Sequence, residues 1–251
     1  MNFLRRFLAP ERPQHPRAVP KGLRVFAVGD VHGCLSELLT LEEMIRARAG
    51  RPGASRNLIV YLGDYVDRGP DSAGVLAHLA KPPDDGLTRR MLMGNHEEML
   101  LRLREEPDRF QAWRQIGGVE TLASYGIDVA PLMTSDGVAA AAMLARALPP
   151  SHLRLLQGLE QLLVVGGYAF VHAGIRPGLP LEQQSAQDLL WIRDAFLEAP
   201  GPHSHFIIHG HTPVEAPDRR PHRLNLDTGV YLTGRLSAVQ LEGDRLEVFS
   251  T

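Results

Sequence analysis

Cysteine is nearly absent from this sequence, with Cys34 the single thiol among 251 residues. One thiol excludes an internal disulfide framework and fits a reducing compartment, so we expect a cytoplasmic protein. Cys34 itself is expected to be a small buried residue at a helix start and not a nucleophile. No apolar run approaches the roughly 20 residues that span a bilayer. The N-terminus also lacks the apolar core and small-residue cleavage site of a secretory signal, so export is not expected.

An excess of either charge is also missing. The chain has 27 Lys and Arg against 29 Asp and Glu, which gives a formal net charge of −2 and a pI near 6.6. This balance argues against nucleic acid as a partner and against stable association with an anionic membrane. Residues 2–8 mix bulky apolar and basic residues, so a weak membrane-binding or partner-binding helix stays open there. Any site for an anion must be local.

Gly- or Ser-rich linkers are absent too, and 251 residues suit one large α/β domain or two small ones. Several prolines lie between Pro10 and Pro20, so residues 1–21 are interpreted as a flexible arm and residues 22–251 as a single domain. Apolar runs at 23–28, 57–62 and 90–93 predict strands, each followed by a polar loop. Helical patterns follow at 35–49 and from Ser72. This alternation predicts an α/β sheet with its functional loops on one edge.

Residues 98–157 show helical spacing without β-branched runs, which predicts a helical insert that packs as a cap. Residues 162–171 then predict a hairpin broken at Gly166-Gly167, and residues 186–197 predict a helix carrying Trp191 and Arg193. The last part of the chain predicts a second, more antiparallel sheet with strands at 206–208, 223–226, 236–241 and 245–249.

The loop after the strand at 57–62 gathers Asp64, Asp67 and Arg68. A carboxylate at a strand end can hold a cation, and the guanidinium fork of an arginine matches the oxygens of phosphate. The loop therefore indicates a metal-dependent phosphate site. A solvated acidic turn is the alternative if the loop is taken alone.

Polar clusters follow four further apolar strands. Imidazoles, carboxylates and an amide oxygen are ligands of borderline divalent cations, and no thiolate cluster competes. Six candidate ligands suit two metal ions about 3.5–4 Å apart, an arrangement that clamps the attacking and leaving oxygens in phosphoryl displacement. The other four clusters are Asp30 with His32, Asn95 with His96, His172, and His211 within His209-Gly210-His211-Thr212.

The ordered motifs resemble those of calcineurin-like metallophosphoesterases. Within that superfamily they are similar to the phosphoprotein phosphatase branch, especially its bacterial and phage lambda-type serine/threonine phosphatases. The resemblance implies a two-sheet β-sandwich core flanked by helices, with the helical insert between the third and fourth motifs. The motifs are Gly29-Asp30-Val31-His32-Gly33, Gly63-Asp64-Tyr65-Val66-Asp67-Arg68-Gly69, Gly94-Asn95-His96-Glu97, His172-Ala173-Gly174 and Gly210-His211-Thr212, with further likeness at Trp191-Ile192-Arg193 and Leu226-Asp227-Thr228-Gly229.

The resemblance also implies a role for each matching residue. One metal ion would be bound by Asp30 and His32, and the other by Asn95, His172 and His211, with Asp64 bridging the two. His96 would protonate the leaving alkoxide while Asp67 orients its ring. The substrate phosphate would be bound by Arg68, Arg193 and Asn95, and the nucleophile would be a water or hydroxide bridging the metals.

One departure concerns Pro213, which stands where many calcineurin-like enzymes have a second histidine. The first metal ion is then expected to have fewer protein ligands. Manganese is the expected metal, although Fe, Zn, Co and Ni accept the same ligands. Outside the motifs, His209 is expected to pack near the site, whereas His203 and His205, in a Pro-Gly-Pro loop, are expected to be exposed.

These features favour a dinuclear metal-dependent phosphomonoesterase that acts on a phosphoprotein or a small phosphoester. Among these we expect a protein serine/threonine phosphatase, with phosphotyrosine as a further substrate class. The alternative is a symmetrical dinucleoside polyphosphate hydrolase, whose family commonly has alanine at the position of Asp67. Asp67 and Glu97 favour the phosphatase. An inactive phosphate-binding scaffold is a third hypothesis, which the complete ligand set opposes.

Overall fold

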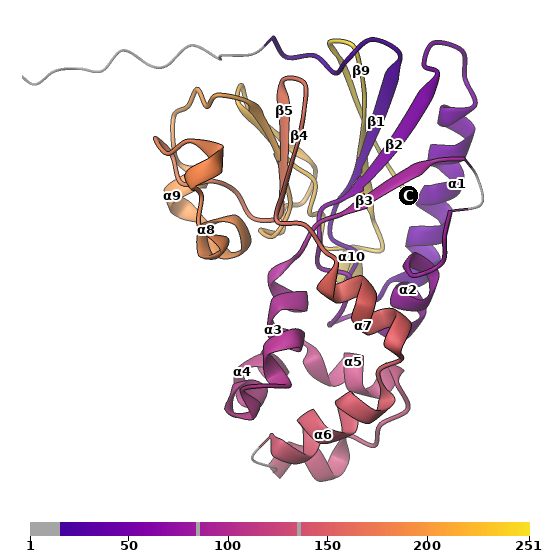
Figure 1. Cartoon of the computed structure of the whole chain (residues 1–251), viewed down its shortest axis with the longest axis vertical. Coiled ribbons are helices and arrows are strands. Elements are labelled where there is room, and N and C mark those ends of the chain that lie inside the picture. The colour runs from indigo at the N-terminus through magenta and orange to yellow at the C-terminus, as the bar shows by residue number, and fades with distance from the viewer. Residues whose placement is uncertain (1–15, 84–85, 135–136) are drawn as a thin grey trace, which may run out of the picture.

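Two five-stranded sheets pack face to face in the computed structural model, with helices on both outer faces (Figure 1). The structure describes residues 16–83, 86–134 and 137–251. This is the predicted α/β sandwich, and the helical insert extends from one end of it (Figure 1).

The first sheet has the order β10-β9-β1-β2-β3. Strands β1, β2 and β3 run parallel, as expected for strands joined by crossover helices, and β9 pairs antiparallel with both β1 and β10. Ala27 of β1 lies opposite Val60 on one side and Val239 on the other. The bounds are β1 Leu23–Val28, α1 Leu35–Ala49, β2 Arg56–Tyr61, α2 Ser72–Leu79, β3 Thr88–Met91, β9 Ser237–Glu242 and β10 Arg245–Ser250.

The second sheet has the order β4-β5-β6-β8-β7 and is mixed. Strands β5, β6 and β8 are parallel, and only the outer strands β4 and β7 run antiparallel to their neighbours. The prediction that the last strands all belong to this sheet was wrong, because β9 and β10 complete the first sheet instead. The open edge of β1 accepts β9, whose Val239 and Leu241 join the apolar layer between the sheets. The bounds are β4 Leu162–Val165, β5 Tyr168–Val171, β6 Phe206–His209, β7 Asp218–Arg219 and β8 Arg223–Asn225.

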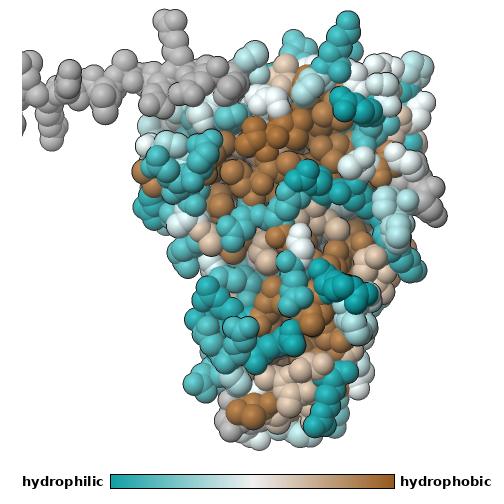
Figure 2. All heavy atoms as spheres, viewed as in Figure 1, coloured by the Kyte–Doolittle hydropathy of each residue, from teal (hydrophilic) through white to brown (hydrophobic). Residues whose placement is uncertain are grey.

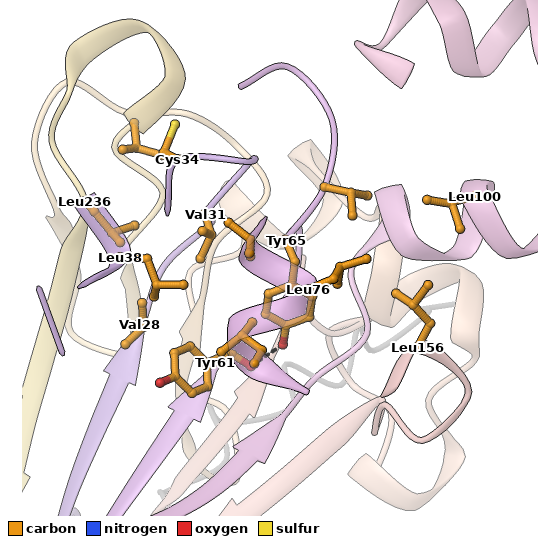
Figure 3. Packing of buried hydrophobic residues seen from close by; sticks show 14 of the residues in the cluster. Val28, Val31, Cys34, Leu38, Tyr61, Tyr65, Leu76, Leu100, Leu156 and Leu236 are labelled. Carbon is orange, nitrogen blue, oxygen red and sulfur yellow. Dashed lines mark hydrogen bonds between the residues drawn. The ribbon is translucent and has the colours of Figure 1, made fainter. Parts of the chain in front are cut away.

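Successive side chains of β1 point to opposite faces of the first sheet and so belong to different layers of the core. Val25 and Ala27 face the second sheet, where they pack in one cluster with Tyr168 and Ile208. Phe26 and Val28 face the opposite way, toward the core formed with α1, α2 and the insert, part of which Figure 3 shows around Tyr61 and Tyr65. A third cluster covers the outer face of the second sheet with α8 and α9. The strand ends that carry the polar loops are therefore fixed by packing on both faces.

The predicted insert is helical in the structure and packs below the first sheet in the view of Figure 1. Trp113 and Leu122 of the insert are buried in the same cluster as Val75 of α2. Its elements, from the helix that leads into it, are α3 Asn95–Leu103, η1 Pro107–Arg109, α4 Phe110–Gln115, α5 Gly118–Ser124, η2 Ala130–Thr134, α6 Val138–Ala147 and α7 Pro150–Gln157.

The helix predicted over residues 186–197 is instead two short helices. α8 ends at Trp191 and α9 begins at Asp194, with Arg193 between them at φ −130° and ψ −107°. This break presents Arg193 from a loop and not from a helix face. The bounds of the remaining elements are η3 Leu181–Gln183, α8 Ala186–Trp191, α9 Asp194–Leu197 and α10 Val230–Thr233.

The last residues of the predicted N-terminal arm pack on the domain. Val19 is buried and donates its N–H to the Gly243 carbonyl at 2.9 Å, and the Ala18 carbonyl accepts from Gly167 at 2.9 Å. Residues 1–15, including the candidate helix at 2–8, lie outside the described residues. Among the residues described, no helix is both long and apolar enough to cross a membrane. Figure 2 shows apolar surface over the strands in its upper half and again over the helices below.

Candidate metal centre and acid–base pair

The carboxyl ends of parallel strands from both sheets meet at one place. β1, β2 and β3 lead into Asp30, Asp64 and Asn95, while β5 and β6 lead into His172 and His211. This convergence follows from topology, since each sheet orders its parallel strands with their carboxyl ends at the same edge. The prediction that the polar loops gather at one edge is confirmed.

The backbone is unusual where these loops turn. Every non-glycine residue with positive φ in the described chain belongs to the predicted site, and the φ values lie between 44° and 70°. The left-handed region costs an L-residue roughly 1–2 kcal/mol, so the surrounding contacts must hold these turns. The five residues are His32, Asp64, Asp67, Arg68 and His211.

Glu97 supplies much of that support. Its buried carboxylate accepts the backbone N–H groups of Asp64 at 2.9 Å, Tyr65 at 2.7 Å and Val66 at 3.2 Å, and also that of Gly94 at 3.0 Å. One side chain of α3 therefore fixes the whole turn that carries Asp64. The sequence placed Glu97 in a motif without indicating this role.

Two groups of side chains could each hold a metal ion, and Asp64 belongs to both. One group joins Asp64 to His32 and His96, and the other joins it to His172 and His211. Asp64 Oδ2 lies 3.6 Å from His32 Nε2, and Oδ1 lies 3.4 Å from His172 Nε2. A carboxylate placed between two ligand groups, with one oxygen toward each, can serve two cations.

Asn95 adds an amide oxygen to the second group, beside His172 and His211. Its Oδ1 lies 2.8 Å from both His172 Nε2 and His211 Nδ1, and these two nitrogens lie 3.2 Å apart. Two ring nitrogens and an amide oxygen therefore converge on one point at the end of the strands. All three side chains are buried, so a cation there would be shielded from bulk water.

Backbone carbonyls fix the tautomers of two of the histidines. His32 Nδ1 lies 2.9 Å from the Val66 carbonyl, and His172 Nδ1 lies 3.0 Å from that of Leu62. A carbonyl only accepts, so each Nδ1 carries the hydrogen and each Nε2 keeps its lone pair for a ligand. Burial lowers the pKa of His32 to about 3, which keeps its ring neutral as a metal ligand must be.

Unpartnered buried atoms mark the same place. In the described chain, the buried atoms without a hydrogen-bond partner include three at the candidate centre, namely Asp30 Oδ1, His32 Nε2 and Asp227 Oδ2. Burial and the neighbouring Asp227 and Asp64 raise the pKa of Asp30 well above its usual range. Such crowding of carboxylates is relieved by a bound cation, so the residues present fit divalent metal ions. Asp30 Oδ2 meanwhile accepts the His211 N–H at 3.0 Å.

Two glycines of the motifs leave room for these carboxylates. A Cβ on Gly210 would stand 1.9 Å from Asp30 Oδ1, and one on Gly94 would stand 2.1 Å from Asp64 Oδ1. Both positions therefore require glycine for close approach of the backbone to a ligand.

His96 and Asp67 form a buried pair beside the ligands. His96 Nδ1 lies 2.7 Å from Asp67 Oδ2, and its Nε2 faces Asp64 Oδ2 at 3.8 Å. Burial alone would lower the pKa of His96, but Asp64 and Asp67 outweigh burial and raise that pKa. The Asp67 carboxylate at Nδ1 orients the ring so that Nε2 faces the candidate metal centre, where a protonated Nε2 could donate a proton.

Arg68 and Arg193 contact different loops beside the centre. Arg68 packs over the Tyr231 ring, with its guanidinium carbon 4.8 Å from the centroid, and donates to the Tyr231 hydroxyl at 3.1 Å. Arg193 is exposed and donates to Thr212, the neighbour of His211, at 3.2 Å. Both guanidinium groups are charged and close to the ligand loops.

The histidines outside the motifs follow the predictions only in part. His209 is buried and packs edge-on against Phe196 with centroids 5.1 Å apart, as expected. His203 is buried as well, with centroids 5.6 Å from Phe196 and 5.0 Å from His222, so the prediction that it is exposed was wrong. His205 is half-buried. The loop folds back under α9, which composition did not indicate. Cys34 is buried, as predicted, and burial raises the pKa of its thiol to about 12.

Sequence reasoning missed several residues of the site. Asp227 lies in one of the motifs, but no sequence pattern indicated a role for it or for Tyr231. Trp113 and Thr121 lie in the insert, yet both contact Asp67. No strand precedes these two residues, so the search for polar clusters at strand ends could not find them.

The two-sheet fold, with candidate metal ligands converging at the carboxyl ends of its parallel strands, is that of a metal-dependent phosphoesterase. The family model for calcineurin-like phosphoesterases matches residues 23–232, so the chain belongs to that family, whose members use a dinuclear divalent metal centre. The chain is 32% identical over 231 residues to serine/threonine-protein phosphatase 1 of Salmonella typhimurium, covering 87% of this chain and 92% of that protein. It is 25% identical to the asymmetrical bis(5'-nucleosyl)-tetraphosphatase PrpE of Bacillus velezensis, covering 84% of this chain and 86% of the relative.

Solved structures agree on the fold. A putative diadenosine tetraphosphatase superposes with a TM-score of 0.61 at 22% identity, covering 92% of this chain and 98% of that chain. A serine/threonine phosphatase from Saccharomyces cerevisiae superposes with a TM-score of 0.53 at 16% identity, covering 95% of this chain and 84% of that chain. At these identities the likeness concerns the fold alone.

Proposed function

We propose that this protein is a phosphomonoesterase that acts on phosphoseryl and phosphothreonyl proteins. The observation that carries the proposal is the buried His96–Asp67 pair, joined at 2.7 Å beside the candidate metal centre. A serine or threonine alkoxide is a poor leaving group and needs a proton as it departs, which a carboxylate-oriented histidine can supply. The similarity to a serine/threonine-protein phosphatase over most of both chains supports the same substrate class.

In this proposal Asp30 and His32 would hold one divalent ion, preferably Mn²⁺, and Asn95, His172 and His211 would hold a second, with Asp64 as a ligand of both. When bound, such ions supply a water of lowered pKa and positive charge for the phosphoryl oxygens. Asp227 is a further candidate metal ligand, because its buried Oδ2 has no hydrogen-bond partner and its carboxylate neighbours Asp30. Asn95 would also contact the substrate phosphate.

Arg68 and Arg193 would bind that phosphate with their planar forks. Arg68 is held by Tyr231, whereas Arg193 is exposed in the break between α8 and α9 and donates to Thr212. His96 would then give its proton to the leaving oxygen while Asp67 keeps the ring in place.

Hydrolysis of dinucleoside polyphosphates is the second candidate. It is favoured by the similarity to an asymmetrical bis(5'-nucleosyl)-tetraphosphatase over most of both chains. A polyphosphate leaving group needs less protonation than an alkoxide, so this activity would make little use of His96 and Asp67.

A direct comparison of substrates tests the choice. With Mn²⁺, we expect kcat/KM for phosphoseryl and phosphothreonyl peptides to exceed that for diadenosine tetraphosphate. Arg193→Ala should raise KM for the peptides, while Arg220→Ala, a matched change at an arginine paired with Asp218, should not. A dinucleotide preferred by tenfold or more, about 1.4 kcal/mol in transition-state binding, would overturn the proposal in favour of the second candidate.

A further inference from the structure

The Asp67 carboxylate is held at both oxygens, and the insert supplies two of its three side-chain donors. Oδ2 lies 2.7 Å from His96 Nδ1 and accepts from Trp113 Nε1 at 2.9 Å, while Oδ1 accepts from the Thr121 hydroxyl at 2.6 Å. Asp67, Trp113 and Thr121 are all fully buried. A carboxylate so placed has one orientation, because rotation would break a bond at each oxygen.

The Thr121 hydroxyl also holds the backbone of Asp67. Thr121 Oγ1 accepts the Asp67 N–H at 2.9 Å and lies 2.9 Å from Ser72 Oγ, which accepts the same N–H at 3.0 Å. Asp67 has φ 70°, a conformation that neighbouring contacts must maintain. One hydroxyl thus contacts both the strained backbone and the carboxylate of the residue that orients His96.

The link between α4 and α5 fits closely around the same turn. A Cβ on Gly118 would stand 2.3 Å from the Trp113 indole, so this glycine lets the chain pack on the ring. The Gly117 carbonyl accepts the Arg68 N–H at 3.0 Å, and Gly117 has φ 105°, a region that favours glycine. Residues 113–121 therefore contact both Asp67 and Arg68, which a cap over the substrate would not need to do.

We infer that Trp113 and Thr121 are positioning residues, which hold Asp67 and, through it, the imidazole of His96 in line with the leaving oxygen. The insert then contributes to the catalytic centre through these two side chains. The inference rests on the proposed role of His96 as general acid. A different reading is that the same hydrogen bonds only fasten the insert to the sandwich, and the two readings differ in what they predict for different leaving groups.

The test compares Thr121→Val and Trp113→Phe with the wild type on phenyl phosphate and 4-nitrophenyl phosphate. Phenolate leaves poorly and needs the proton, whereas nitrophenolate leaves readily without it. For phenyl phosphate we expect kcat to fall about 10- to 100-fold, the usual cost of losing an orienting partner. For 4-nitrophenyl phosphate the loss should stay under about threefold, with KM and bound Mn²⁺ unchanged.

Two controls separate positioning from packing. Thr121→Ser keeps the hydroxyl and should retain the wild-type ratio between the substrates. Thr134→Val makes the same substitution at an exposed threonine of the insert and should change nothing. Equal losses on both substrates, or wild-type rates on phenyl phosphate, would overturn the inference. Because both substrates are aryl monoesters, this outcome is independent of whether the wild type prefers peptides or dinucleotides.

Discussion

Asp64 is the residue on which both candidate metal positions depend. Its two oxygens face different histidines, and its backbone is held at φ 51° by Glu97. Asparagine tolerates that backbone conformation and matches the shape of aspartate, so a substitution there changes charge more than fold.

We therefore expect Asp64→Asn to abolish phosphatase activity and to reduce bound metal from two ions to one or none, because the bridging charge is lost. Metal content per chain, measured by elemental analysis after gel filtration, checks this. Asp71→Asn in the same loop caps α2, a task asparagine also performs, and should keep both ions. Two retained ions and near-normal turnover in Asp64→Asn would refute the bridging role.

At the scale of elements, α9 packs over a group of buried histidines. His203 lies against Phe196, with His222 and Arg223 as its nearest titratable and charged neighbours. Burial is the main cause that lowers the pKa of His203 to about 4, and His222 and Arg223 add to it. In the unfolded chain the same imidazole titrates near 6.5.

This difference has a definite sign. Between pH 6.5 and about 4, His203 is protonated in the unfolded chain but neutral in the folded protein. Its contribution to the free energy of unfolding therefore falls as pH decreases through this range. Below about pH 4 that contribution is constant, because His203 is protonated in both states. His203→Phe keeps a ring against Phe196 and removes the titration. We expect urea unfolding of the variant between pH 7 and 4.5 to show a shallower loss of stability than the wild type. Parallel pH profiles would contradict the burial of a neutral His203.

The elements themselves were predicted well where one physical signal dominated. The strand at 23–28 and the helix at 35–49 match the structure because apolar runs and helical spacing are local. Asp30, Asp64, Asn95 and His172 converge as predicted because each follows a parallel strand. The assignment of β9 and the positions of Trp113 and Thr121 depend on contacts between distant segments, which no local pattern encodes.

On the scale of the whole molecule, the candidate centre joins the two sheets, so ligands bound there should stabilise the entire fold. A ligand that binds only the folded state at 100 times its dissociation constant adds about 2.7 kcal/mol. For a chain of this size each 1 kcal/mol raises Tm by roughly 2–4 °C.

Removing metal with a chelator should accordingly lower Tm by roughly 5–10 °C for each saturated site, and Mn²⁺ should restore it. Thermal unfolding followed by circular dichroism measures the shift. Asp64→Asn serves as the reference, since it binds fewer ions and should show a smaller Tm shift in both treatments. An Mn²⁺ shift of equal size in both proteins would place the stabilising ion elsewhere on the chain.

The pairing of β9 with β1 also has a consequence for folding during translation. β1 emerges from the ribosome early, yet its antiparallel neighbour follows only after the insert and the second sheet have been translated. Until residues 237–242 appear, one edge of β1 has no partner strand to cover its N–H and carbonyl groups, and such edges invite pairing with other chains. A premature stop before Ser237 would thus do more than shorten the protein, because it would leave the strand that presents Asp30 open to aggregation.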